Sequence, residues 1–354
     1  MQISGYKPLE AFAALFTGAT GIASGPAVSA NDVALGAFHL SKDKLAGSLY
    51  HATPLLFTGL AVALGLRAGL FNIGAQGQMT VGALAAAIVG LIGSGANGKG
   101  GLPPAVHIPL TLIAGGLAGA AWGAIPGALK ALRGVHEVIV TIMLNFVALN
   151  LAGYLVTHNL KDTARQSMAP QTALMAKSAW LPPLIPHSNL TIGLLLALLA
   201  VAAISFLMRK TALGYEIRAV GQGTDAARAA GIPVAAILIK TMALSGALAG
   251  IAGALEAMTV THRYIGGVEG TYGFDGIAVA LLGGGSGGGI LGSALFFGAL
   301  ANGARYMQLV TDVPDTIAAI VQAFVIVFVG IRWRRSQKIL KPATVGNQPE
   351  RRSA

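Results

Sequence analysis

Long apolar runs of membrane-spanning length are the feature that most limits how this chain can fold. Hydrophobic residues make up 54% of the 354-residue sequence and charged residues only 10%, and the mean hydropathy is +0.69. Only α-helices and closed β-barrels can cross a bilayer, because every backbone polar group must be paired internally. The alternating segments of about ten residues that make a barrel are absent. We therefore predict an all-α, polytopic membrane helical bundle.

Nine spans are predicted along the chain. They cover residues 45–66, 70–94, 105–129, 135–157, 190–208, 234–256, 276–291, 292–310 and 316–331. The second and seventh begin at polar, Gly-rich stretches, so we expect one or two broken or re-entrant helices. Three regions follow from this division: an external amphipathic N-terminal segment, 1–44, with an apolar patch at 11–16; a transmembrane domain, 45–331; and a basic cytoplasmic tail, 332–354.

Lys and Arg residues are distributed unevenly between the two sides of these spans. With the C-terminus in the cytoplasm, 14 of them lie inside and eight outside, which agrees with the basic character of cytoplasmic loops. The net charge of +11 is therefore attributed to membrane orientation, and no nucleic-acid partner is expected. Nine spans place Met1 outside, so we expect that a first span is missing from this sequence.

Metal and nucleotide chemistry are not expected in this chain. It has no cysteine, and His107, His136 and His262 lack the spacing of metal ligands and are assigned to the membrane interface. Residues 93–99 spell GxxxxGK, but Gly100 follows where a phosphate-binding loop has Ser or Thr. No cofactor is predicted for this chain, so any ATP hydrolysis would belong to a separate subunit.

Two loops are long enough to carry a function. The external loop 158–188 is Pro-rich and polar, which favours a lid or a docking surface. In the inner loop 209–233, a short amphipathic helix is predicted within 220–232, with Thr224 as N-cap and Asp225 in its first turn. Gly231 and Pro233 are expected to end it. The alternative is a helix that only turns the chain around.

Neutral amides interrupt the apolar sequence at the start of the second span. Asn72, Gln76 and Gln78 in the stretch GLFNIGAQGQ (69–78) can line one helix face, where they would bind a neutral polar solute without the desolvation cost of a charge. Asn145 in the fourth span is a further candidate for the solute path. The alternative is that these amides only tie helices together.

Asp275 and a row of glycines carry two further hypotheses. Asp275 precedes a short Gly-interrupted span, where it can cap the helix or contact the solute. Gly115, Gly119, Gly123 and Gly127 recur every four residues along the third span and predict close helix packing. Packing within the chain and packing across a homodimer both fit this pattern.

Four blocks in order along the chain resemble the permease subunits of ABC importers of the branched-chain amino acid, ribose and nucleoside type. They are GLFNIGAQGQ (69–78), EVIVTIMLNFVALNLAGYLV (137–156), VGQGTDAARAAGI (220–232) and YGFDGIAVALLGG (272–284). The chain looks most similar to the nucleoside permeases that work with basic-membrane-protein-like lipoproteins. It departs from the family pattern at Gln76, where Glu is usual, and at the Gly/Ser run 283–289, where a Pro often follows the turn.

The resemblance implies a ten-span plan, a multi-pass location in the bacterial inner membrane with a cytoplasmic C-terminus, and a set of partners. These partners are an ABC ATPase, a second permease in a homo- or heterodimer, a periplasmic or lipoprotein solute-binding protein, a small polar solute and membrane lipid. The block DAARAAGI resembles the loop that docks on the ATPase. The residues implied in that coupling are Arg218, Gly221, Asp225, Ala226, Ala227, Arg228 and Gly231.

We therefore expect a translocation subunit, not an enzyme, that imports nucleosides or related ribose-containing solutes. Import of a pentose or another monosaccharide is the alternative within the same class. An ion-coupled secondary carrier is the alternative from another class, but such a carrier needs a relay of buried acids, and only Asp275 is predicted to lie deep. A membrane enzyme would need a nucleophile and base, or a metal cluster, within a span.

Overall fold

The computed structural model describes residues 7–24, 32–35, 38–94, 100–161, 170–186, 188–266 and 270–314, with single positions between 316 and 327. Its helices are α1 (Pro8–Thr20), α2 (Lys42–Arg67), α3 (Ala75–Gly90), α4 (Pro104–Arg133), α5 (Glu137–Leu155), α6 (Gly193–Lys210), α7 (Ala212–Gln222), α8 (Thr224–Ala229), α9 (Val234–Glu256), α10 (Tyr272–Leu282) and α11 (Gly287–Thr311). Short π-helical turns extend α5 through Val156–Leu160 and α9 through Ala257–Thr261.

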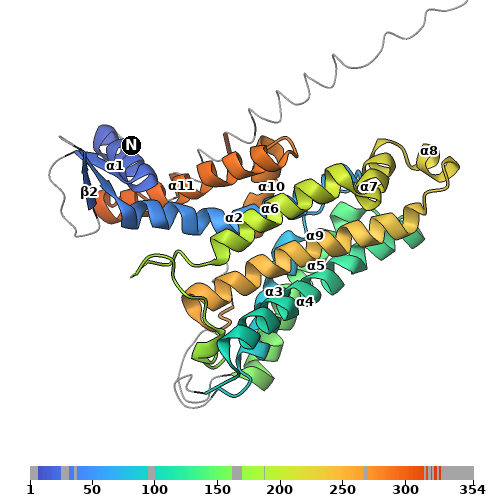
Figure 1. Ribbon diagram of the computed structural model, residues 1–354, viewed down its shortest axis with the longest axis horizontal. Coiled ribbons are helices and arrows are strands. Elements are labelled where there is room, and N and C mark those ends of the chain that lie inside the picture. The colour runs from blue at the N-terminus through green and yellow to red at the C-terminus, as the bar shows by residue number, and fades with distance from the viewer. Residues whose placement is uncertain are drawn as a thin grey trace, which may run out of the picture.

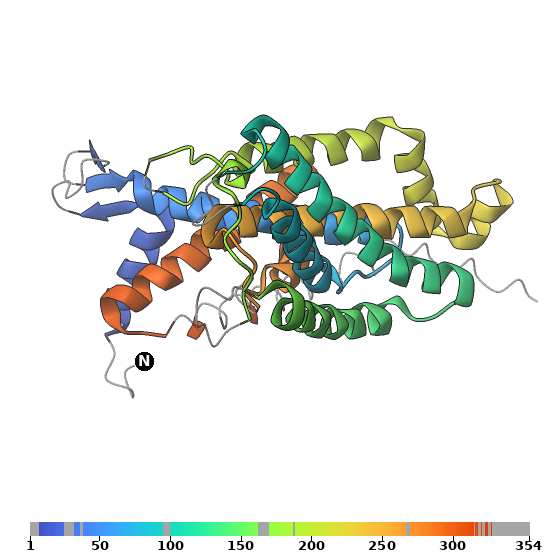
Figure 2. The ribbon, with the colours of Figure 1, turned by 90° about the horizontal axis from the view of Figure 1, so that it is seen from below.

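The long helices run side by side in one bundle (Figures 1 and 2). α7 and α8 lie at one end of it, which we call the α8 end, together with the last turns of α2, α4 and α6 and the first turns of α5, α9 and α11. α1 lies at the opposite end. At the α8 end Lys130, in the last turn of α4, pairs with Glu137 at the start of α5 at 2.9 Å, and Glu137 is buried.

Within the described residues, six helices are long and apolar enough to cross a membrane. They are α2, α4, α5 with its π turn, α6, α9 with its π turn, and α11, and they correspond to six of the nine predicted spans. The chain is therefore an all-α, polytopic membrane protein. Two other predicted spans are short helices, α3 and α10, and the ninth, 316–331, lies almost wholly outside the described residues, as does the tail 332–354. The count of nine is not confirmed.

The boundary predicted between 291 and 292 is wrong. The helix that begins at Tyr272 ends at Leu282, and a turn over Gly283–Ser286 leads into the single helix α11. Gly284 and Gly285 adopt φ values of 58° and 68°, a conformation that residues with a Cβ rarely take. The Gly/Ser run thus breaks the chain several residues earlier than the apolar pattern indicates.

The four glycines of α4 pack against α9 of the same chain. A Cβ built on Gly119 would lie 2.2 Å from the Gly246 carbonyl oxygen, and one on Gly246 would lie 2.1 Å from the Gly119 oxygen. Gly115 and Gly123 face Gly250, Ala254 and Met242 in the same way, and Gly127 faces Met242. These contacts let the two backbones touch, which is how small residues join helices in lipid. Of the two packing modes that the sequence allowed, the structure has the internal one.

The N-terminal segment contains structure that the sequence did not predict. After α1, strands β1 (Ile22–Ser24), β2 (Asp32–Leu35) and β3 (Phe38–Ser41) form an antiparallel sheet in the order β1-β3-β2. The small residues Ala11, Ala14 and Gly18 of α1 are buried, and α1 packs on α11, while Leu9, Phe12 and Phe16 are exposed. The segment is therefore a docked helix and sheet at the end opposite α8.

The described part of the loop 158–188 is packed onto the bundle. Met175 and Ala176 are fully buried, and the Ala176 amide donates to the Gly90 carbonyl at the end of α3. The Trp180 ring stacks on His262 with centroids 3.7 Å apart. His107, predicted at the interface, is fully buried and lies 2.8 Å from Ser178 Oγ. Residues 162–169 of this loop lie outside the described part.

Candidate translocation site

The stretch 69–78 turns the chain back into the bundle after α2. Gly69 has a φ of 73°, and the chain then runs without helix until α3 begins at Ala75. The Asn72 side chain supports this turn, because its Oδ1 accepts a hydrogen bond from the Gly74 amide at 2.9 Å. A short helix therefore begins inside the protein, which satisfies the expectation of a broken helix at this position.

Asn72 and Gln78 form a closed, buried amide pair. Asn72 Nδ2 donates to Gln78 Oε1 at 2.9 Å and to Ser245 Oγ of α9 at 2.8 Å, and Gln78 Nε2 donates back to Asn72 Oδ1 at 3.2 Å. Ser245 in turn donates to the Ala61 carbonyl of α2. Both amides are almost completely inaccessible to solvent. In this conformation they join α2, α3 and α9, and neither is available to a solute.

Asn145 joins α5 to the same turn. Its Oδ1 accepts from the Gly77 amide at 2.8 Å, and its Nδ2 donates to the Ile73 carbonyl at 3.0 Å. A Cβ on Gly77 would lie 2.9 Å from Asn145 Cα, so the glycine is what lets α5 come this close. Asn150, five residues further on, is exposed and bonds only to Phe146 of its own helix.

Gln76 connects the first turns of two short helices. Its Oε1 accepts from the Gly273 amide in the first turn of α10 at 2.9 Å, and its Nε2 donates to the Gly270 carbonyl at 3.0 Å. A glutamate in this place would accept the first hydrogen bond but could not donate the second. The amide at the position where the family usually has Glu therefore matches a backbone carbonyl that needs a donor.

Asp275 lies in the first turn of α10, where the helix dipole favours a negative charge. Its Oδ2 accepts a hydrogen bond from the Thr271 side-chain Oγ1 at 2.8 Å and not from a backbone amide. Thr271 occupies the N-cap position and no side chain caps the helix, so the predicted capping role of Asp275 is not seen. The Asp275 side chain is only partly buried. Gln76 and Asn145 are also partly exposed. The start of α3 contacts α5 through Asn145 and the start of α10 through Gln76, and Asp275 lies in that first turn of α10. We call this place the α3–α10 seam.

Sequence reasoning missed a second polar group near the opposite end. Tyr50 of α2 donates a short hydrogen bond to Glu256 of α9, and His51 bonds to the Tyr272 hydroxyl at the start of α10. Near the end of its predicted span Glu256 could be expected to reach water or headgroups, but in the structure Tyr50 holds it between α2 and α9. Tyr50 and His51 border an open cavity of about 410 Å³, which Asn189, Asn302 and Arg305 also line. The adjacent Tyr50 and His51 inside the predicted span 45–66 were the sequence feature that could have indicated this polar group.

The coupling segment is two helices, not one. Gly223 separates α7 from α8. The short helix predicted within 220–232 is α8, and α7 before it was not predicted. Gly221 belongs to α7, where a Cβ would lie 2.1 Å from the Arg67 carbonyl oxygen, and it therefore packs against α2. Thr224 begins α8 but Gly223 occupies its N-cap position. Gly231, with a φ of 81°, follows the end of α8 as expected.

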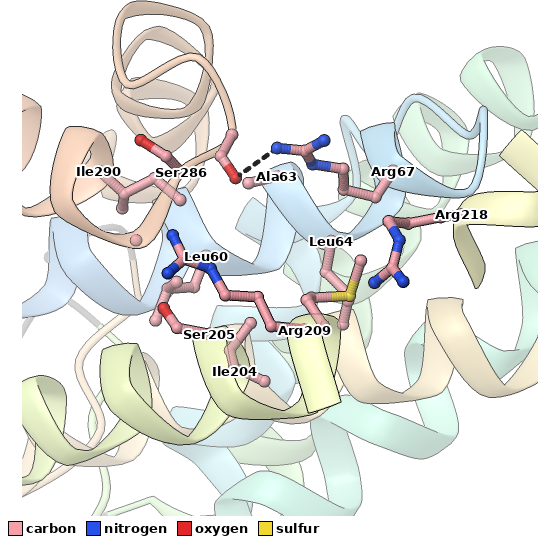
Figure 3. Close-up of a pocket in the computed structure, with 13 residues that line it drawn as sticks. Leu60, Ala63, Leu64, Arg67, Ile204, Ser205, Arg209, Arg218, Ser286 and Ile290 are labelled. Atoms are coloured by element: carbon pink, nitrogen blue, oxygen red, sulfur yellow. Dashed lines mark hydrogen bonds between the residues drawn. The ribbon is translucent and has the colours of Figure 1, made fainter. Parts of the chain in front are cut away.

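α8 projects from the bundle (Figure 1). Asp225, Ala226 and Arg228 are exposed, whereas Ala227 is buried. Asp225 and Arg228 pair with each other at 3.4 Å on this surface, an exposed contact that contributes little to stability. Arg218 of α7 does not join them, because it lines a cavity with Arg67 and Arg209 (Figure 3).

Spanning helices and half-helices that begin inside the bundle are the architecture of a membrane transport permease. Residues 44–330 match the family described as the permease component of the branched-chain amino acid transport system. The chain belongs to this family. It is thus a translocation component that operates with an ATPase and a solute-binding protein.

Three relatives cover most of the chain. The guanosine ABC transporter permease protein NupP of Bacillus subtilis is 41% identical over 278 residues, which are 78% of this chain and 78% of NupP. The nucleoside ABC transporter permease protein NupB of Lactococcus lactis is 34% identical over 94% of this chain and 86% of its own length. The glucose ABC transporter permease protein TsgB13 of Haloferax volcanii is 37% identical over 79% and 74%.

Proposed function

We propose that this permease imports nucleosides or related ribose-containing solutes across the bacterial inner membrane, with the α8 end and the C-terminus in the cytoplasm. Two similar permeases are named for guanosine and for nucleosides, and the one named for glucose keeps a monosaccharide as the alternative solute. The basic residues at the helix ends on the α8 side support the orientation.

The solute path is proposed to run along the α3–α10 seam. The observation that carries this proposal is that two half-helices begin there, linked by Gln76, with Asn145 and Asp275 beside them. Half-helix starts direct the positive ends of their helix dipoles at a polar solute. Of the five candidates from the sequence, Asn72 and Gln78 require a conformational change to reach this path, because both are buried in the present state.

A second permease subunit is proposed to complete the path. α5 borders the seam, and Phe146 and Val147 on its outer face are 60% and 50% exposed. An apolar helix face next to a polar seam suits a partner subunit, because the partner would then close the path against lipid. Whether the partner is a second copy or a different permease does not change this arrangement.

α8 is proposed to dock in the separate ATPase subunit, which binds and hydrolyses ATP. Its position at the tip of the α8 end supports this, as does its small exposed Ala226 between the charged Asp225 and Arg228. Replacement of Gly231 by valine strains a φ of 81° and is expected to abolish ATP-dependent uptake with normal membrane levels. Gly292→Val on α11 is the control, because a Cβ there meets nothing within 4 Å. Unchanged uptake in the Gly231 variant would contradict the coupling role.

Uptake assays test the solute path and the solute together. Vesicles carrying the reconstituted importer with its ATPase and binding protein would be given guanosine, ribose or glucose. Asp275→Asn, which removes the charge but keeps an oxygen that can accept from the Thr271 hydroxyl, and Gln76→Ala are expected to reduce nucleoside uptake more than they reduce protein level. If both variants took up nucleoside as fast as the unmodified protein, the proposal that the solute path follows the seam would be refuted. Uptake driven by an ion gradient without ATP would favour a secondary carrier.

A further inference from the structure

A cavity of about 320 Å³ opens at the α8 end between α2, α6, α7 and α11 (Figure 3). One part of its wall is apolar and is formed by Leu60, Leu64, Ile204, Met208 and Ile290, while Ser205 and Ser286 also line the cavity. Three guanidinium groups border it, Arg67 from the end of α2, Arg209 from the end of α6 and Arg218 from α7. The cavity therefore combines a hydrocarbon surface with a concentrated positive charge.

The three arginines have no acidic partner in the described part of the chain. Ion pairs there involve Lys7, Lys130 and Arg228, and the interaction seen for Arg67 is one hydrogen bond to the Gly285 carbonyl at 3.0 Å. Three cations that face one cavity repel each other unless an anion lies between them. Guanidinium groups match phosphate best, because their planar donors can bind two of its oxygens at once.

The first turn of α11 adds the positive end of a helix dipole to the same cavity. Ser286 is its N-cap and accepts from the Gly289 amide at 3.1 Å, while Gly287 also lines the cavity. A Cβ on Gly288 would meet nothing within 4 Å, so the first turn is open on that side. The positive end of this 25-residue helix strengthens the attraction for an anion.

We infer that this cavity binds the phosphate headgroup of an anionic phospholipid, with the three arginines around the phosphate and an acyl chain along the apolar wall. The position favours a lipid over a free anion. α2 and α6 are spanning helices that end at Arg67 and Lys210, so the guanidinium groups lie at headgroup level while Leu60 and Ile204 lie deeper. Basic pockets between spanning helices are suited to lipid headgroups, and a free phosphate would gain nothing from the apolar wall.

A bound lipid would connect the ATPase-facing part of the chain to the bundle. Arg218 lies on α7, which Gly223 alone separates from α8, whereas Arg67 and Arg209 belong to spanning helices. The phosphate would bridge these elements with charge-assisted hydrogen bonds. Lipid composition of the inner leaflet is therefore expected to affect how firmly α7 is held.

Native mass spectrometry of the purified protein tests this with phosphatidylglycerol and phosphatidylcholine of the same acyl chains, and with inorganic phosphate. Phosphatidylglycerol is expected to bind more tightly than phosphatidylcholine, and Arg209→Gln with Arg218→Gln is expected to weaken it by about tenfold or more, since each charged hydrogen bond contributes about one factor of ten. The matched control is Arg133→Gln with Lys210→Gln, which removes the same charge at the same end outside the cavity.

Four outcomes would overturn the inference. Equal loss of binding in the two double variants would mean diffuse surface charge, and equal binding of the two lipids would mean no headgroup recognition. Inorganic phosphate that binds without help from an acyl chain would identify a free-anion site. Displacement of the lipid by the ATPase subunit at equimolar concentration would identify an acidic protein segment as the occupant. The single variant Arg218→Gln repeats the comparison if the double variant does not fold.

Discussion

Replacement of Asn72 by alanine separates the two roles that its amide could have. The variant removes four buried hydrogen bonds, which link Asn72 to Gln78 twice, to Ser245 and to the Gly74 amide. Hydrogen bonds contribute about 1 kcal/mol each, and those between helices in a membrane average about 0.6 kcal/mol. Loss of all four therefore costs about 2–4 kcal/mol, because the orphaned Gln78 amide can find few new partners in a dry site.

The free energy of unfolding in mixed micelles, titrated with a denaturing detergent, would measure this loss. Asn150→Ala is the matched control, because Asn150 is exposed and bonds only to its own helix; it is expected to change the free energy by less than about 0.5 kcal/mol. In a double-mutant cycle, Asn72→Ala and Gln78→Ala should cost less together than the sum of their separate effects, because they share two hydrogen bonds.

The opposite result would refute the interpretation of Asn72 as a helix tie. If Asn72→Ala abolished uptake but lowered the unfolding free energy no more than Asn150→Ala does, the amide would act on the solute and not on the fold. Equal effects of both variants on stability would show that the hydrogen bonds are replaced by water or by neighbouring groups.

Two further predictions concern packing and pH. Gly119→Leu is expected to lower the unfolding free energy by about 3 kcal/mol or more, because its Cβ would lie 2.2 Å from the Gly246 oxygen. The control is Gly153→Leu on α5, which has open space at the Cβ and should leave the unfolding free energy nearly unchanged. Equal losses in the two variants would contradict the α4–α9 contact. Burial against Trp180 lowers the pKa of His262 in the folded protein. The unfolded state therefore binds more protons at this residue than the folded state does. The resulting stability is retained above the ordinary His pKa of about 6.5 and is lost as the pH falls below it. His262→Phe should flatten this dependence in thermal unfolding between about pH 7 and pH 5, and an unchanged slope would assign it to another group.

The membrane class, the family and most of the spanning helices were predictable from the sequence. The position of a spanning helix can be found from one continuous stretch of sequence, because each such helix must cover the hydrocarbon core with apolar side chains. The short helices were harder. α10 and α11 were divided at the wrong residue, because glycine is common inside membrane-spanning helices and the Gly/Ser run 283–289 therefore did not fix where the helix breaks; the backbone geometry places the turn at Gly283–Ser286.

The hydrogen-bond partners of the side chains could not be predicted from the sequence, for a different reason. Asn72, Gln76 and Asn145 are the same kind of amide, and periodicity could place them on one face but could not say what that face meets. In the structure Asn72 forms a hydrogen bond to α9, Gln76 to α10 and Asn145 to the turn before α3. His51 and Tyr272 are separated by 221 residues, and no local pattern carries such a pairing.

The sequence by itself determined that the chain is a helical membrane permease, because apolar length and motif order are properties of the chain read locally. The tertiary structure alone decided that Gly119 faces Gly246 within one chain, that the Asn72 amide is closed off, and that Arg67, Arg209 and Arg218 share one cavity. The physical reason is that partners depend on which helices pack together. That choice is made by the whole bundle, through shape and polar pairing between residues far apart in the chain.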